Sequence, residues 1–285
     1  MALVKFTKMH GLGNDYVYFD CVNNPNLIPD DKIEATAQKV ADRNFGVGGD
    51  GIVLILPHTE ADFQMRMINA DGSEAEMCGN AIRCVGKYLF DTGHTDKDVI
   101  TVMTGAGILT LVMTVVDGKV EKVRVDMGEP ILKGLQIPTT IDKEQVVGET
   151  ITLSSGKEYP MTCVSMGNPH CVIFVDEITD ENIFVEGKEL EVSPVFPNRI
   201  NVEFAKVKSR TEIDMRVWER GTGETLACGT GATATAVAAM LNGLVDRKVA
   251  INLLGGTLEI EWDEATNHAF MTGPATVAFT GEIEL

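Results

Sequence analysis

A short pattern that occurs twice constrains the fold of this chain more than any other feature of the sequence. In each copy a Glu is followed four residues later by Cys-Gly, and then by a run of apolar residues with helical spacing. The copies occupy residues 72–81 and 222–231, so Cys78 and Cys228 lie 150 residues apart in a chain of 285. Two halves of similar size are therefore expected to place one cysteine each at the start of a helix.

Weaker matches extend this repeat in the same order along both halves. Residues 13–19 resemble residues 167–174 at an offset of 154, and residues 49–53 lie opposite residues 199–203 at an offset of 150. Such a period is far too long for a solenoid. The sequence therefore predicts two similar domains that face each other.

Most segments between these matches alternate apolar and polar residues, as at 63–68 and 213–218, and so predict strands. Hairpin strands are expected within 98–115 and 120–127, broken by turns at 105–107 and 117–118. Further strands are expected at 248–253, 257–262, 268–272 and 276–283. Helices are expected at about 30–42, 79–91 and 229–243, and the small residues of the last suit a helix buried inside a closed sheet. The predicted class is α+β: two pseudo-symmetric domains, each a mostly antiparallel sheet or barrel around a central helix, with the active site in the cleft between them.

The expected domain boundaries follow from the repeat and from one unmatched strand. The strand at 276–283 has no counterpart in the first half, which suggests that the chain returns to the first domain at its end. The N-terminal lobe, with Cys78, is expected to span 1–126 and to be completed by 274–285. The C-terminal lobe, with Cys228, is expected to span 127–273.

Charge and hydropathy exclude several classes of protein. Forty-two acidic residues against 24 basic ones give a net charge of −18, which repels nucleic acids and anionic lipid surfaces. No stretch approaches the roughly 18–20 apolar residues of a membrane span, and the first residues lack the apolar region of a signal peptide. A cytoplasmic protein with a small-molecule substrate is expected.

The cysteines do not indicate disulfides or a metal. Six in a large chain are too few for a disulfide framework, and zinc-ligand spacing is absent. Neither a Walker A motif nor a complete dinucleotide-binding glycine motif occurs, so no cofactor is expected. Four cysteines are expected to pack as small apolar residues: Cys21, Cys84, Cys163 and Cys171.

The two Cys-Gly sites suggest acid–base chemistry. The unpaired N–H groups and dipole at a helix start should lower the pKa of a thiol there below its free value of about 8.5, and can also bind a carboxylate. With one such site on each side of an α-carbon, a thiolate removes the proton from one face and the opposite thiol returns one to the other. This inversion requires neither pyridoxal phosphate nor a metal.

Three other polar residues are candidates for the site. Glu219 and Arg220 precede the second cysteine and form either a salt-bridged turn or contacts to charged groups of a substrate. His170 follows a Gly-Asn-Pro turn and lies opposite Tyr16 in the repeat, where it is either structural or catalytic.

Taken together, these motifs resemble the diaminopimelate epimerase family over nearly the whole chain. The residues that carry the resemblance are 11–16, 69–74, 77–84, 167–170 and 219–231. The resemblance implies an isomerase of lysine and peptidoglycan precursor biosynthesis that interconverts LL- and meso-2,6-diaminopimelate without a cofactor. It also implies a homodimer, and a two-base mechanism with Cys78 and Cys228 as the thiol pair.

The resemblance assigns further roles residue by residue. His170 and Glu219 resemble residues that assist the thiols. The residues that look like substrate-binding positions are Asn14, Asn69, Asn168, Asn201, Glu219 and Arg220, with Gly79, Asn80, Gly229 and Thr230 at the helix starts. One departure is visible, because Gly51 stands where some family members carry a Gln.

Three alternatives remain open at this stage. Another cofactor-independent racemase, such as one resembling proline racemase, would keep two cysteines. It would not need residues that bind a second, distal amino-acid group of the substrate. A thiol redox protein would use the same pair as a switching disulfide, although a resolving cysteine usually lies close in sequence. An amino-acid-binding protein without catalysis would use the same anion pockets, and solvent deuterium uptake at the α-carbon would distinguish it from an enzyme.

Overall fold

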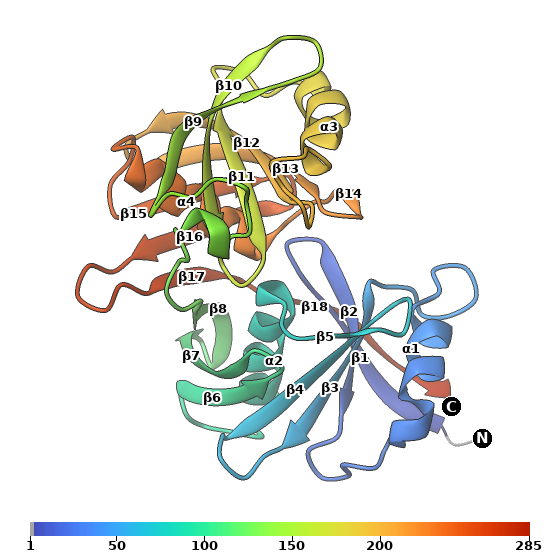
Figure 1. Ribbon diagram of the computed structural model, residues 1–285. Helices are drawn as coiled ribbons and strands as arrows, with labels where there is room; N and C mark the ends of the chain where they lie inside the picture. The colour runs from blue at the N-terminus through green and yellow to red at the C-terminus, as the bar shows by residue number, and fades with distance from the viewer. Residues whose placement is uncertain (1–2) are drawn as a thin grey trace. The chain divides into compact units, whose positions relative to one another are not determined.

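The structure, a computed structural model, describes residues 3–285 and divides them into two compact units. Unit 1 contains the residues up to Val125 together with Gly273–Leu285, and unit 2 contains Asp126–Thr272. Both units are built mainly of β-strands with few helices (Figure 1).

Unit 1 is assembled around the first and last strands of the chain. Its elements are β1 (Leu3–Gly11), β2 (Asn14–Asp20), η1 (Asp30–Lys32), α1 (Ile33–Ala41), β3 (Gly51–Pro57), β4 (Phe63–Asn69), β5 (Glu74–Ala75), α2 (Gly79–Asp91), β6 (Val99–Thr104), β7 (Gly107–Val116), β8 (Lys119–Asp126) and β18 (Thr276–Glu284). Strand β1 pairs antiparallel with both β2 and β18, so the end of the chain completes this sheet. Strand β2 runs parallel to β3, which pairs antiparallel with β4.

Unit 2 has the same strand arrangement around its own helix. Its elements are η2 (Gly134–Gln136), β9 (Val146–Thr152), β10 (Glu158–Ser165), β11 (Pro169–Phe174), η3 (Asn182–Gly187), α3 (Lys188–Glu191), β12 (Asn201–Ser209), β13 (Glu212–Glu219), β14 (Gly223–Glu224), α4 (Gly229–Leu241), β15 (Lys248–Leu253), β16 (Gly256–Trp262) and β17 (Ala269–Pro274). Strand β11 runs parallel to β12, which pairs antiparallel with β13.

The register of these strands reproduces the repeat seen in the sequence. In unit 1, Gly51 of β3 pairs with Tyr16 on one side and with Asn69 on the other. In unit 2, Asn201 of β12 pairs with His170, and its neighbour Val202 pairs with Trp218. The same parallel-then-antiparallel order leads into a helix in both units, which confirms the predicted pseudo-symmetric α+β class.

Small side chains let the two cysteine-bearing helices pack closely against strands. Helix α4 lies among the strands of unit 2 (Figure 1) and contacts β10, β11, β12, β15 and β16. Its alanines and threonines are buried almost all round. Helix α2 contacts β1, β2 and β7, and an added Cβ at Gly86 would lie 3.1 Å from Leu111 Cδ1. Both helices are therefore held rigidly by the sheets, and so are the residues at their N-termini.

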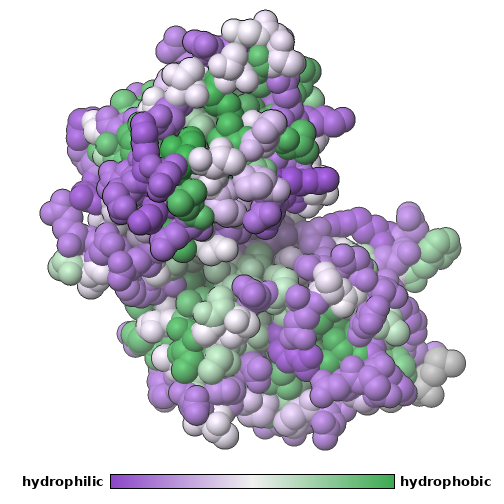
Figure 2. Space-filling model, in the orientation of Figure 1, coloured by the Kyte–Doolittle hydropathy of each residue, from purple (hydrophilic) through white to green (hydrophobic). Residues whose placement is uncertain are grey.

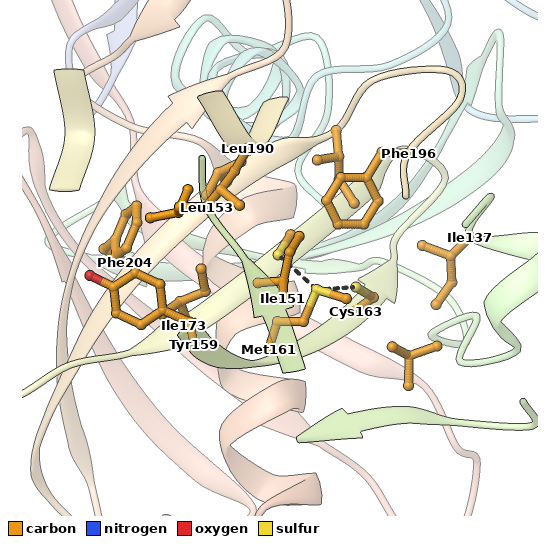
Figure 3. Packing of buried hydrophobic residues seen from close by; sticks show 14 of the residues in the cluster. Ile137, Ile151, Leu153, Tyr159, Met161, Cys163, Ile173, Leu190, Phe196 and Phe204 are labelled. Carbon is orange, nitrogen blue, oxygen red and sulfur yellow. Dashed lines mark hydrogen bonds between the residues drawn. The ribbon is translucent and has the colours of Figure 1, made fainter. Parts of the chain in front are cut away.

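A large apolar cluster of unit 2 fills the space between β9–β12 and the short helices η3 and α3 (Figure 3). Cys163 and Cys171 belong to it, and their sulfur atoms lie 4.0 and 3.7 Å from the Met161 sulfur. Cys21 and Cys84 are buried in unit 1, where burial raises the pKa of their thiols to about 12 and about 11. These four thiols pack as apolar residues, as predicted.

The surface is mainly hydrophilic. Hydrophilic residues cover most of the face in view, with smaller apolar areas between them (Figure 2). Among residues 3–285, no helix is long and apolar enough to span a bilayer.

Candidate functional site

The unit 1 site is centred on Cys78, which directly precedes helix α2. Its backbone is extended, with φ −138° and ψ 119°, and the helix begins at Gly79. The Cys78 thiol donates to Oδ1 of Asn14 over 3.2 Å, so the residue at the start of β2 meets the residue at the start of the helix. Cys78 is half-buried, so its sulfur is both held in place and partly open to solvent.

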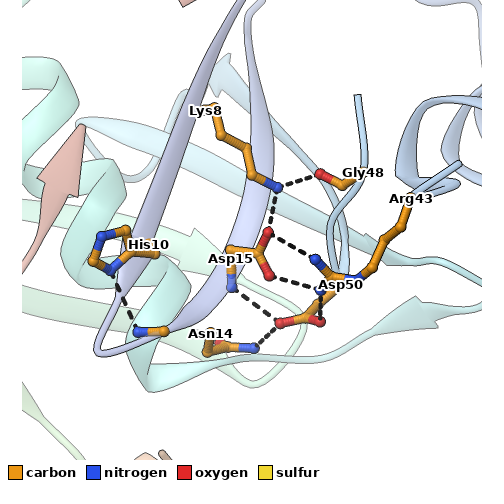
Figure 4. Close-up of polar contacts among 8 residues, drawn as sticks. Lys8, His10, Asn14, Asp15, Arg43, Gly48 and Asp50 are labelled. Atoms are coloured by element: carbon orange, nitrogen blue, oxygen red, sulfur yellow. Dashed lines mark hydrogen bonds and ion pairs between the residues drawn. The ribbon is translucent and has the colours of Figure 1, made fainter. Parts of the chain in front are cut away.

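A charged network fixes the orientation of Asn14 (Figure 4). Asn14 Nδ2 donates to Asp50 Oδ2 over 2.7 Å, which turns Oδ1 of the same amide toward Cys78. Arg43 in turn pairs with Asp50 and Asp15, at 2.8 Å to each. The amide geometry beside the thiol therefore depends on a carboxylate and a guanidinium that do not touch the sulfur.

The pKa of Asp15 reflects the same network. Burial acts to raise the pKa of this carboxyl group, but Arg43 and Lys8 outweigh burial and lower it below its usual range. Lys8 also donates to the carbonyl of Gly48, which ties the network to the turn before β3. Neither Arg43 nor Asp50 stands out in the sequence, except that residues 49–53 belong to the repeat.

Asn69 lies at the end of β4, beside Gly51. Its side chain donates to the Ser73 hydroxyl over 3.1 Å, within the turn that leads to Cys78. A Cβ at position 51 would lie 2.1 Å from the carbonyl oxygen of Ile68 and 2.9 Å from Cα of Asn69. The departure at Gly51 therefore has a structural reason, because this backbone leaves no space for any side chain there.

The unit 2 site is centred on Cys228, which precedes helix α4 in a similar extended conformation, with φ −116° and ψ 110°. Its sulfur accepts from the backbone N–H of Gly231 at 3.3 Å and lies 3.5 Å from the Thr230 hydroxyl. Cys228 thus caps its helix with its own side chain. The thiol is only 6% exposed, unlike that of Cys78.

The pKa of Cys228 differs from the sequence prediction. Burial raises the pKa of this thiol well above its usual value, and the charges of Glu219 and Glu203 raise it further. The Thr230 and Gly231 contacts at the helix start act in the opposite direction but are weaker. The expectation that a helix start lowers the thiol pKa is therefore wrong for Cys228, because desolvation dominates.

His170 lies beside this thiol site and is completely buried. Its Nδ1 lies 2.7 Å from Glu203 Oε1, and its Nε2 lies 3.1 Å from Oδ1 of Asn168. The structure therefore brings two predicted residues, His170 and Asn168, into direct contact. It adds Glu203, which the sequence analysis missed although a Glu inside the apolar run 200–205 is unusual.

Glu219 lies at the end of β13 and accepts from the Thr225 hydroxyl. Burial raises the pKa of this carboxyl group; Thr225, His170 and the Cys228 thiol oppose the rise, and the charge of Glu203 adds to it. A carboxyl group with a raised pKa beside a thiol and an imidazole is typical of sites that transfer protons.

The remaining two candidates meet through the backbone. Asn201 donates to the carbonyl of Pro169 over 2.8 Å and accepts from the Arg220 N–H at 2.9 Å. The guanidinium of Arg220 donates to the Asn198 carbonyl over 3.2 Å and belongs to an exposed residue. Asn201 is thus fixed by main-chain partners. The Arg220 guanidinium belongs to an exposed residue and can pair with a carboxylate.

The helix starts complete both sites. Gly79 and Asn80 begin α2, and Gly229 and Thr230 begin α4. Such positions present N–H groups and a positive dipole end to an anion. In the part of the chain that the structure describes, no group of three or more His, Cys, Asp or Glu side chains is arranged to hold a metal ion.

Solved structures of other proteins share this fold. The chain superimposes on a hydroxyproline epimerase from Agrobacterium vitis with a TM-score of 0.68 at 15% identity, covering 99% of this chain and 91% of the other. It superimposes on a phenazine biosynthesis protein of the PhzF family from Bacillus anthracis with a TM-score of 0.69 at 17% identity, covering 100% of both. These similarities show a shared two-unit fold.

Sequence comparison identifies the family within that fold. The diaminopimelate epimerase family model matches residues 6–133 and 162–278. The diaminopimelate epimerase of Acetivibrio thermocellus is 56% identical over 286 aligned positions, covering 99% of each chain. The chain belongs to the diaminopimelate epimerase family.

Proposed function

We propose that the protein interconverts LL- and meso-2,6-diaminopimelate by proton transfer at one α-carbon, with Cys78 and Cys228 as the two proton carriers. Family membership supports the reaction. The observation that carries the residue assignment is the equivalence of the two thiols. Each is the last extended residue before a helix and follows the same order of strands in its unit.

The helix starts supply the electrostatic part of the proposed mechanism. The substrate carboxylate next to the reacting carbon accepts from the N–H groups that begin α2 and α4, where the positive dipole ends stabilise the charge that develops on deprotonation. Asn14, Asn69, Asn168 and Asn201 supply amide groups, and Glu219 supplies a carboxylate for the ammonium groups. Arg220 offers two parallel N–H groups to the distal carboxylate.

The proton transfer requires one thiolate and one thiol at the start of each turnover. The thiolate takes the α-proton, so the C–H bond breaks, an S–H bond forms and the electron pair stays on the substrate. The opposite thiol then gives its proton to the other face of the carbon and becomes a thiolate. After one turnover the protonation of the two sulfurs is exchanged, and the reverse reaction starts from this state.

The surroundings of Cys228 indicate its resting state. Its raised pKa means that this thiol keeps its proton at neutral pH. We propose that Glu219, which lies close enough to act on the pKa of this thiol, and His170, which acts on the pKa of Glu219, assist this sulfur. We further propose that the protein acts as a cytoplasmic homodimer and binds no cofactor.

Solvent isotope uptake tests the reaction directly. LL-diaminopimelate incubated with the reduced protein in heavy water, with no cofactor added, is expected to gain one deuterium at one α-carbon as meso product forms. Proline and 4-hydroxyproline serve as competing substrates and are expected to remain unlabelled. Absence of label in diaminopimelate, or faster labelling of proline, would refute the proposed substrate.

A further inference from the structure

Glu203 is a buried carboxyl group that the reaction described above does not use. It lies on β12 with no exposed surface, and its Oε1 lies 2.7 Å from His170 Nδ1. Its other oxygen, Oε2, is buried and has no hydrogen-bond partner among the described residues. A buried carboxylate oxygen without a partner is costly, so its presence requires a reason other than stability.

The same carboxyl group lies close to the Cys228 site. A Cβ added at Gly231 would lie 2.7 Å from Glu203 Oε1 and 3.2 Å from the Cys228 sulfur. Glu203 and the thiol therefore both lie against the first turn of α4, beside Gly231. A glycine is needed there because any side chain would collide with the carboxylate.

The fold does not require a carboxylate at this position, as unit 1 shows. At the repeat offset of 150, the residue equivalent to Glu203 is Val53, which is completely buried in β3. The strand next to it carries Tyr16 where unit 2 carries His170. The same arrangement of strands thus forms with an apolar residue and without the His–Glu contact.

We propose that Glu203 is a positioning residue of the unit 2 site: its carboxylate holds the His170 ring through Nδ1–H and keeps a negative charge beside the Cys228 thiol. This inference rests on the proposed function of Cys228. Holding Nδ1 leaves Nε2 as the ring nitrogen directed at Asn168. The charge favours the protonated thiol, in agreement with the direction of the Cys228 pKa.

The charged groups around this sulfur come from three strands. His170 approaches from β11, Glu203 from β12 and Glu219 from β13, and the thiol itself lies at the start of α4. Glu219 also contributes negative charge, so removal of Glu203 alone leaves part of the effect in place.

Reactivity of Cys228 without substrate tests this inference separately from the epimerase activity. The pH dependence of iodoacetamide labelling, followed at the Cys228 peptide by mass spectrometry, is compared for wild type, Glu203→Gln and Glu203→Asp. The midpoint is expected to fall by about one pH unit in Glu203→Gln, because a like charge at short range is lost. Glu203→Asp keeps the charge and is expected to retain most of the wild-type midpoint.

Glu186→Gln is the matched control. Glu186 is another buried acid of unit 2, but its partners are Lys157, Tyr159 and Asn182 and it does not contact the Cys228 site. Its variant is expected to lose comparable stability and to leave the Cys228 midpoint unchanged. An unchanged midpoint in Glu203→Gln, or an equal change in the control, would overturn the inference even if the protein is an active epimerase.

Two further measurements test whether Glu203 holds the His170 ring in place. In wild type, the long-range ¹H–¹⁵N spectrum of His170 is expected to show a proton on Nδ1. In Glu203→Gln, kcat for diaminopimelate is expected to fall on the order of 10- to 100-fold with little change in KM, as for loss of a group that orients an acid–base residue. An Nδ1 without a proton in wild type, or a change confined to KM, contradicts the assigned role.

Discussion

Substitution of Gly51 by Ala provides a sharp test of how the unit 1 site is built. The added Cβ would lie 2.1 Å from the Ile68 carbonyl oxygen, whereas ordinary van der Waals contact begins at 3.4 Å. The two atoms must therefore separate by about 1.3 Å. Residues 51 and 68 both belong to strands that pair in the β3–β4 ladder, so the backbone itself must move and no flexible side chain can absorb the shift.

The expected cost follows from this geometry. Overpacking of this kind costs about 1–3 kcal/mol, and loss of one ladder hydrogen bond adds about 1 kcal/mol. A loss of about 2–4 kcal/mol corresponds to a fall in melting temperature of about 5–15 °C for a unit of this size. Because Cα of Asn69 would lie 2.9 Å from the same Cβ, the proposed substrate contact of Asn69 is displaced as well, and KM is expected to rise.

Gly86→Ala is the control for this experiment. Its Cβ would lie 3.1 Å from Cδ1 of Leu111, which is the end of a flexible side chain, and at ordinary contact distance from Val123 and Met113. Ala is favoured over Gly in a helix by about 1 kcal/mol. We expect an unchanged or higher melting temperature by differential scanning calorimetry. If Gly51→Ala melts within about 2 °C of wild type, or if Gly86→Ala falls equally far, the packing argument is incorrect.

Three further predictions concern the polar groups of the sites. Cys78→Ser and Cys228→Ser are each expected to reduce epimerisation to background in a circular dichroism assay, because each face of the carbon needs its own proton carrier; full activity in either variant excludes the two-base scheme. Arg43→Met is expected to cost about 1 kcal/mol at pH 7, since the pair is partly exposed, and less at pH 3. The sign follows from the lowered pKa of Asp15, whose stabilising effect is present above about pH 4 and is lost as pH falls through its folded-state value; an equal cost at both pH values in urea unfolding argues against it. Arg220→Ala is expected to raise KM at least tenfold with a smaller change in kcat, and an unchanged KM removes Arg220 from the distal carboxylate.

Local patterns in the sequence were sufficient for the elements that carry the cysteines. The helix expected at 79–91 is α2 (Gly79–Asp91), and the helix expected at 229–243 is α4 (Gly229–Leu241). Apolar spacing and a preceding turn determine both, and these are properties of neighbouring residues. By contrast, η3 and α3 at 182–191 were not expected, since their charged residues show little apolar periodicity and their ordering depends on packing against β12 and β13.

The groups that orient the site residues could not be read from the sequence in the same way. Asp50 contacts a residue 36 positions away, and Glu203 contacts His170 across 33 positions. Such pairs depend on the register of parallel strands, which a single sequence does not fix. The pKa of Cys228 was wrongly predicted for a related reason, because the helix start is a local feature whereas burial arises from the whole unit.

The residues beside the two cysteines differ between the units, and this difference affects which of the two thiols holds the proton. If both cysteines had identical surroundings, neither would be favoured as the proton holder, and the resting protein would be a mixture of states. The duplicated strands keep the thiols equivalent in geometry, while the residues beside them differ: Tyr16, Val53 and Asn69 in unit 1 stand where unit 2 has His170, Glu203 and Glu219. Glu203 and Glu219 favour the proton on Cys228, and since the reaction must also run in reverse, bound substrate has to offset that preference.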